Sequence, residues 1–251
     1  MGVTIALDHY KVYKADYAMA HYKVYSVYPA IGPSERDVEL RDQFSEPGFI
    51  PAIAREIKYF ATPASKTRPN SSMAGDTDNL YDDPTHLTWY RLEVEKEEMT
   101  VIFHNQFDGQ GQRWRIHGPV YLLVPTDKNK VPGRDESMHF LCYEVVKVIK
   151  GIEEQLTDKI FNLRDQYNKK EEVEIMKPKF FCAPVGKIYE GRQETERVDE
   201  HLACYEVGTQ QGDLVDRRPV TISNQLDELL ELTLRETRML CVPSEKRDWS
   251  R

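Results

Sequence analysis

Four cysteines at matched positions are the strongest chemical signal in this 251-residue sequence. Cys142 and Cys204 each lie three residues after a histidine, and Cys182 and Cys241 each lie two residues before a proline. At the equivalent positions in the first half of the chain, both residues of each pair are apolar, as expected of side chains that touch across neighbouring strands. Of the three connectivities that four cysteines permit, we therefore predict Cys142–Cys182 and Cys204–Cys241 disulfides.

Two other chemistries of these cysteines remain open at this stage. Buried free thiols would act as small apolar side chains. A zinc site built from His139, Cys142 and Cys182 is the third interpretation, and strand geometry disfavours it because residues three apart on a strand point to opposite faces. Disulfides, in contrast, indicate an oxidising compartment.

The cysteines belong to three sequence blocks that recur in the same order four times. The first block begins with a histidine and has a tyrosine four residues later, which gives His21, His86, His139 and His201 with Tyr25, Tyr90, Tyr143 and Tyr205. The second block has a glutamine after aspartate or asparagine, at Gln43, Gln106, Gln166 and Gln225. The third block ends in P-x-x-K, at Lys66, Lys128, Lys187 and Lys246. This recurrence predicts four copies of one structural unit.

The second block alternates between the repeats. Repeats one and three have Asp42 and Asp165 before the glutamine, whereas repeats two and four have Asn105 and Asn224. The A-B-A-B order predicts a duplicated two-repeat unit. We expect one domain at residues 21–130 and a second at residues 135–251, separated by a polar stretch with a Pro-Gly turn signal.

The blocks themselves are rich in β-branched and aromatic residues and alternate in polarity, which is typical of strands. A further alternating apolar pair precedes the third block, so we expect four strands per repeat; repeat one departs from the pattern with Ala52 and Ala54. The predicted fold is all-β, with two tandem small β-barrel or β-sandwich domains made of two four-strand repeats each, and a four-bladed β-propeller is the alternative. Residues 146–156 are expected to form one helix. Residues 1–20, which are rich in tyrosine, are expected to form an N-terminal arm or an extra strand.

None of the repeated polar residues nominates a catalytic centre. A catalytic group is needed once, in a unique environment, whereas the histidine recurs in every repeat on the same strand face as the tyrosine. We therefore expect the histidines, tyrosines and glutamines to have structural roles, and we expect no enzyme, cofactor or metal site. A carbohydrate site that uses Asp42 and Gln43 is an alternative.

In these blocks the sequence resembles a family of tandem modules of unknown function, seen in predicted secreted proteins of bacteria and archaea. The family pattern runs H-x-x-C-Y-x-V, then D-Q-F or N-Q-F, then L-C-x-P-x-x-K. The two best matches begin at His139 and His201 and end at Lys187 and Lys246. The likeness spans most of residues 21–246, and it implies a fold and a secreted location rather than an activity.

The charge of the chain limits its partners. A formal net charge of −8 disfavours nucleic acid and anionic membranes, which bind clustered lysine and arginine. No apolar run approaches the length of a membrane span. We expect a non-enzymatic structural or interaction module, extracellular or at the cell surface, that binds a protein partner or itself. The alternatives are a small-ligand or carbohydrate-binding protein or an enzyme with a site between the two domains, and a self-assembling filament or shell subunit that uses the N-terminal arm.

Overall fold

The structure is a computed structural model in which most of the chain is described. The described ranges are residues 20–28, 35–45, 48–69, 85–128, 138–150, 159–167, 170–189, 192–194, 201–212 and 218–251. The predicted N-terminal arm, apart from its last residue, and the predicted domain boundary around Pro132 lie outside these ranges. Within them, no helix is long and apolar enough to cross a membrane.

Thirteen antiparallel strands make up the described part of the chain. They are β1 (His21–Tyr28), β2 (Arg36–Asp42), β3 (Ile50–Thr67), β4 (His86–Glu93), β5 (Glu97–Asn105), β6 (Asp108–Lys128), β7 (His139–Lys150), β8 (Ile160–Arg164), β9 (Glu171–Tyr189), β10 (Arg192–Glu194), β11 (His201–Gly212), β12 (Arg218–Ser223) and β13 (Leu230–Ser250). The all-β prediction is confirmed. The helix expected at residues 146–156 is wrong as far as it is described, because β7 continues as a strand through Lys150.

Each repeat supplies two shorter strands and one long strand, and repeat three adds the three-residue β10, which pairs with the end of β9. The expectation of four strands in every repeat is wrong. The third and fourth predicted strands are two halves of one long strand, such as β3 with its 18 residues. The pairing of β3 with β4 shifts register between Ala54 and Ile57 and again before Tyr59. A bulged register of this kind bends a strand without ending it. The sequence pattern does not distinguish one bent strand from two separate strands.

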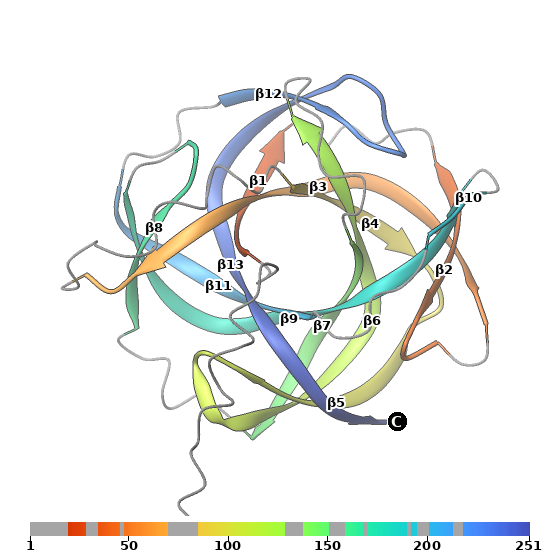
Figure 1. Cartoon of the computed structure of the whole chain (residues 1–251), viewed down its shortest axis with the longest axis horizontal. Coiled ribbons are helices and arrows are strands. Elements are labelled where there is room, and N and C mark those ends of the chain that lie inside the picture. Colours follow the sequence, from red (N-terminus) through yellow and green to blue (C-terminus); the bar gives the residue numbers. More distant parts are fainter. Residues whose placement is uncertain are drawn as a thin grey trace, which may run out of the picture.

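Eight strands close into a ring around the centre of the molecule (Figure 1). The order around the ring is β1, β3, β4, β6, β7, β9, β11 and β13, and β13 pairs back to β1. Each repeat contributes its first strand and the second half of its long strand. Because the ring is closed, the paired stretches of these strands have no open edge.

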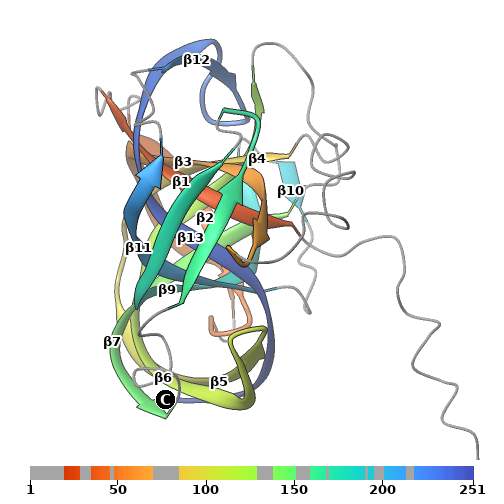
Figure 2. The ribbon, with the colours of Figure 1, turned by 90° about the vertical axis from the view of Figure 1, so that its left-hand side faces the viewer.

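The second-block strands β2, β5, β8 and β12 are spaced around this ring (Figure 1). Each of them pairs with the first half of the long strand of its own repeat and with the end of the long strand two repeats away. The reciprocal pairs are β2 with β9 and β8 with β3, then β5 with β13 and β12 with β6. Figure 2 shows that β12 and β5, from repeats four and two, lie at opposite ends of the molecule.

These pairings join the two predicted halves of the chain in one hydrogen-bonded sheet. Strands from residues 21–130 pair directly with strands from residues 135–251, so the halves do not form two separate sheets. The propeller alternative is also wrong, because a propeller blade pairs its strands within one repeat. A propeller does not form because opposite repeats exchange strands, and this exchange leaves no repeat with a complete sheet of its own.

Two apolar clusters lie on the two faces of the ring. The smaller cluster contains residues from all eight ring strands, and Trp89 of β4 reaches Phe180 of β9 with ring centroids 5.8 Å apart. These strands are three places apart in the ring, so this cluster fills its interior. The larger cluster includes Tyr25 and the inward side chains of the second-block strands, such as Val38, and lies between the ring and those strands.

The four cysteines lie in the interior cluster and are fully buried. Cys142 is bonded to Cys182 and Cys204 to Cys241, which is the connectivity that the sequence predicts. Each pair sits directly opposite across neighbouring strands, and the apolar counterparts do the same, with Val24 opposite Ala61 and Trp89 opposite Leu123. The free-thiol and zinc alternatives are therefore wrong, because every sulfur is bonded to another sulfur.

Replacement of one disulfide by the apolar pair of repeat one is the first testable change. The double substitution Cys142→Val and Cys182→Ala should lower the free energy of unfolding by about 4 kcal/mol, because the unfolded chain loses a closed loop of 40 residues. Urea denaturation without reductant measures this difference. In the presence of reductant the difference between wild type and variant should shrink, and equal stability of the two oxidised proteins would show that the bond does not stabilise the fold.

Candidate functional site

The repeated glutamine, histidine and lysine meet where neighbouring repeats join. Gln106 of repeat two donates from its amide to His21 Nε2 at 2.5 Å and accepts from Lys66 Nζ at 2.6 Å, and both partners belong to repeat one. The same relation places Gln166 with His86 and Lys128, and Gln225 with Lys187. Gln43 of repeat one contacts His201 of repeat four, so these contacts run around the whole ring.

The repeated tyrosine makes a second set of contacts, with the repeat on the opposite side. Tyr25 donates to Asp165 at 2.6 Å, and Tyr143 donates to Asp42 at 2.7 Å. In the other two repeats, Tyr90 donates to Asp227 at 2.8 Å and is bonded to Asn224, and Tyr205 accepts from Asn105 at 2.8 Å and from Gln112. The tyrosines of the A repeats therefore contact aspartate, and those of the B repeats contact the asparagine of the same block.

Asp42 shows how these groups are held. Its carboxylate is buried and accepts from the backbone N–H groups of Phe44 and Ser45, from the Ser45 hydroxyl and from Tyr143. Burial raises the pKa of Asp42 above its ordinary value, against the effect of these donors, and burial beside this carboxyl raises the pKa of Tyr143 well above its own. Asp42 and Gln43, the two residues of the carbohydrate alternative, both bond to side chains of other repeats.

Three of the third-block lysines, Lys66, Lys128 and Lys246, lie over aromatic rings of other repeats. Lys66 Nζ is 4.5 Å from the ring centroid of Phe107 and 4.4 Å from that of Phe161, and Lys246 lies over Phe44 at 5.6 Å. Burial, together with the charges of Arg68 and Lys159, lowers the pKa of Lys66 to about 8. The lysine is therefore another contact between repeats, which the sequence pattern alone did not reveal.

A buried charged cluster breaks the four-fold pattern. Lys23 is fully buried and forms an ion pair with Glu171, and its Nζ lies 4.0 Å from Asp165. Glu171 also accepts from Thr209 at 3.0 Å and from Thr237 at 2.9 Å. The other repeats have threonine, leucine and alanine at the position of Lys23, so a lysine at this place is the sequence signal of the cluster.

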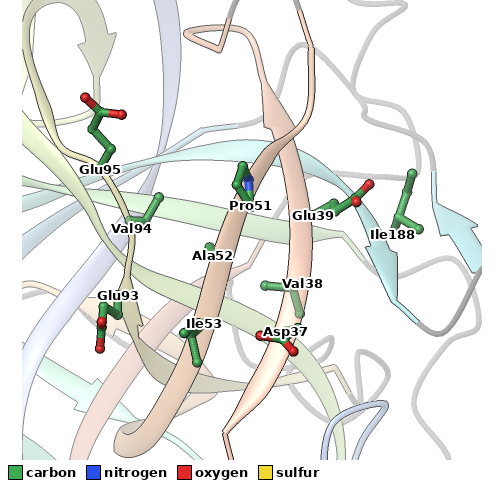
Figure 3. A pocket seen from close by; sticks show the side chains of 10 residues that line it. All are labelled: Asp37, Val38, Glu39, Pro51, Ala52, Ile53, Glu93, Val94, Glu95 and Ile188. Atoms are coloured by element: carbon green, nitrogen blue, oxygen red, sulfur yellow. The ribbon is translucent and has the colours of Figure 1, made fainter.

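One groove opens on the outer surface, over β2 and β3 (Figure 3). Its volume is about 740 Å³. The lining residues are Asp37, Val38, Glu39, Pro51, Ala52, Ile53, Glu93, Val94, Glu95 and Ile188. The groove includes Ala52, where repeat one departs from the sequence pattern, and none of its residues is among the site residues predicted from the sequence. In the part of the chain that the structure describes, no three His, Cys, Asp or Glu side chains are grouped so that they could hold a metal ion.

The comparisons with known proteins agree with the repeat architecture. A family model described as a repeat of unknown function (DUF7450) matches residues 86–215, about half of the chain. The chain belongs to this repeat family. No curated protein and no solved structure matches it.

Removal of one tyrosine hydroxyl should separate the two kinds of tyrosine contact. Tyr143→Phe deprives a buried carboxylate of a donor and should lower the free energy of unfolding by about 1.5–3 kcal/mol, whereas Tyr205→Phe, whose partners are neutral amides, should lower it by about 1 kcal/mol. Denaturant titration of both variants measures this difference. The control is Tyr28→Phe at an exposed tyrosine, and a loss at Tyr28 equal to that at Tyr143 would contradict the assignment.

The buried Asp42 should also make stability depend on pH. Because its pKa is raised in the folded chain, the folded state binds the proton more tightly than the unfolded state does. The free energy of unfolding of the wild type relative to Asp42→Asn should therefore fall as pH rises from about 4, the ordinary value of the carboxyl, through the raised pKa. Urea denaturation at a series of pH values tests this. The reverse change at the equivalent position of repeat two, Asn105→Asp, should make the free energy of unfolding fall with pH in the same way. A stability difference between wild type and Asp42→Asn that does not vary with pH would refute the raised pKa of Asp42.

Proposed function

We propose that this chain is a non-enzymatic structural or interaction module of an extracellular protein, and that it acts through its outer surface. The observation that supports this most is the use of the repeated polar side chains. Gln106 is held between His21 and Lys66, and Asp42 between Tyr143 and Ser45. Groups that are bonded on several sides within the fold are poor candidates for an acid, base or nucleophile that must reach a substrate.

The extracellular part of the proposal is supported by the two disulfides. Bonds of this kind persist in oxidising compartments and are rare where glutathione keeps thiols reduced. The closed ring supports a structural or surface role as well. Its eight strands pair on both edges, and the interior is filled by side chains such as Trp89 and Phe180, which gives a firm support for surface loops and strands.

A thermal-unfolding screen of the full chain tests the proposal against the small-ligand alternative. Carbohydrates, nucleotides and divalent cations are added at millimolar concentration, and we expect none of them to stabilise the protein saturably. A ligand present at about one hundred times its Kd would raise the free energy of unfolding by about 2.7 kcal/mol, so binding would be seen. Saturable stabilisation that is lost in Gln43→Ala or Asp42→Asn would contradict the proposal.

The compartment is tested on protein taken from the cells that make it. The chain is unfolded in denaturant so that the buried cysteines are accessible. Iodoacetamide should then label none of Cys142, Cys182, Cys204 and Cys241 before reduction and all of them after reduction, as read from the mass of the intact chain. Labelling of the unreduced protein would contradict the extracellular part of the proposal and leave the structural part standing.

A further inference from the structure

The groove over β2 and β3 has a regular composition that follows from strand register. Ile53 of β3 lies opposite Asp37 of β2 on one side and opposite Glu93 of β4 on the other. The side chains of these cross-strand neighbours therefore share one face of the sheet. In the same way Ile188 of β9 lies opposite Glu39. Figure 3 shows these side chains around the hollow. Acidic and apolar strands therefore alternate across this face, with Asp37 and Glu39 on β2 beside Pro51 and Ile53 on β3.

The same face in the other repeats is different at every one of these positions. In place of Asp37 paired with Ile53, the other repeats have Thr100 with Arg115, Ile160 with Glu174 and Pro219 with Thr233. In place of Glu39 paired with Pro51, they have Ile102 with Arg113, Asn162 with Glu172 and Thr221 with Glu231. The acidic residues on β2 and the apolar residues on β3 are thus particular to repeat one, although the backbone pairing is common to all four.

The strands beneath the hollow carry small side chains on their other face. Val38 lies opposite Ala52, whereas the equivalent second-block residues lie opposite Trp114, Val173 and Leu232. Val38 and Ala52 line the groove, and both are buried in the larger apolar cluster. Repeat one therefore has the smallest side chain of the four at this position.

The negative charge of the groove indicates a positively charged partner. Four carboxylates line it, and no lysine or arginine does. Glu93 is engaged by Arg55, whose Nε lies 3.0 Å from the Glu93 carboxylate. Asp37, Glu39 and Glu95 form no ion pair with any residue in the described ranges, and all three are exposed. Three uncompensated carboxylates beside an apolar floor favour a cation that also carries apolar groups.

We propose that this groove binds an extended basic segment of a partner protein in which lysine or arginine alternates with apolar residues. Side chains two apart on an extended chain lie on one side at a spacing of about 6.6 Å, the same spacing that separates Asp37 from Glu39 on their strand. When such a segment lies along β2 and β3, its basic side chains reach Asp37 and Glu39 on one side, and its apolar side chains rest on Pro51 and Ile53 on the other. A small cation would be poorly enclosed, because the acidic side chains of the groove are exposed. This inference rests on the proposed function and names the surface that it uses.

Binding of a labelled peptide to the full oxidised chain tests the proposal by fluorescence anisotropy. The probe has about eight residues that alternate lysine with valine, long enough to cross the groove as an extended chain. Asp37→Asn, Glu39→Gln and Glu95→Gln combined should weaken its binding about tenfold, as expected from three exposed charge pairs. The matched control combines Glu172→Gln, Glu228→Gln and Glu231→Gln, which remove the same net charge away from the groove, and it should change the affinity less than about twofold.

A second variant copies the outward pair of repeat two into the groove. Asp37→Thr with Ile53→Arg reproduces Thr100 opposite Arg115, a combination that this fold already contains. It should abolish binding of the basic peptide while the thermal unfolding of the chain stays close to that of wild type. Equal binding by the groove variants and the control variant would overturn the proposal.

Two further probes identify the occupant. A peptide in which glutamate replaces lysine should not bind. Spermidine, which carries positive charges but no branched apolar side chains, should bind at least tenfold more weakly than the lysine-valine peptide. Spermidine that binds as tightly as the peptide would overturn the proposal in favour of a small-cation site. Failure of the peptide to bind well-folded wild-type protein would remove the groove proposal alone, because the proposed function is refuted only by the small-ligand screen and the alkylation of unreduced protein.

Discussion

The second-block strand of each repeat has an edge that its own repeat does not pair, and the architecture follows from where that edge finds its partner. β2 pairs along one edge with β3 and along the other with β9, from the repeat two places further on. A single repeat also leaves one face of its apolar residues open, as repeat units generally do. When opposite repeats exchange strands, the open edge is paired and the open apolar face is covered. The ring closes because every repeat makes the same exchange.

This exchange gives a physical meaning to the A-B-A-B order of the sequence. Asp42 and Asp165 belong to opposite repeats, and each accepts from the tyrosine of the other. The alternation therefore matches pairs that face each other across the ring, and it does not require two tandem domains. From sequence alone the two interpretations are equivalent, because similarity between repeats one and three does not say whether they are copies side by side or partners in contact.

The cysteine pairing could be predicted from the sequence because it depends on contacts within a single repeat. The wider architecture could not, because it depends on contacts between distant repeats. Cys142 and Cys182 lie on strands that are neighbours within one repeat, so joint presence and absence of the pair is visible in a comparison of the four repeats. The partner of β2 lies far away in the sequence, and nothing in β2 specifies β9. The structural role expected for Gln106 did not name its partners, because the repeat pattern does not say which repeat the amide reaches; the partners are His21 and Lys66 of another repeat.

Departures from the repeat pattern differ in meaning according to where they lie. Lys23 departs inside the fold, where a buried charge without a partner is costly, and its partners Glu171 and Asp165 belong to the opposite repeat. A closure that placed any other repeat at this position would leave Lys23 unpaired, so this ion pair fixes which repeat faces which. Asp37 departs on the surface and forms no ion pair with the described residues, so no requirement of the ring explains it. The ring does not need the residues on the outer face of β2 and β3, so a binding surface is able to differ there without disturbing the fold.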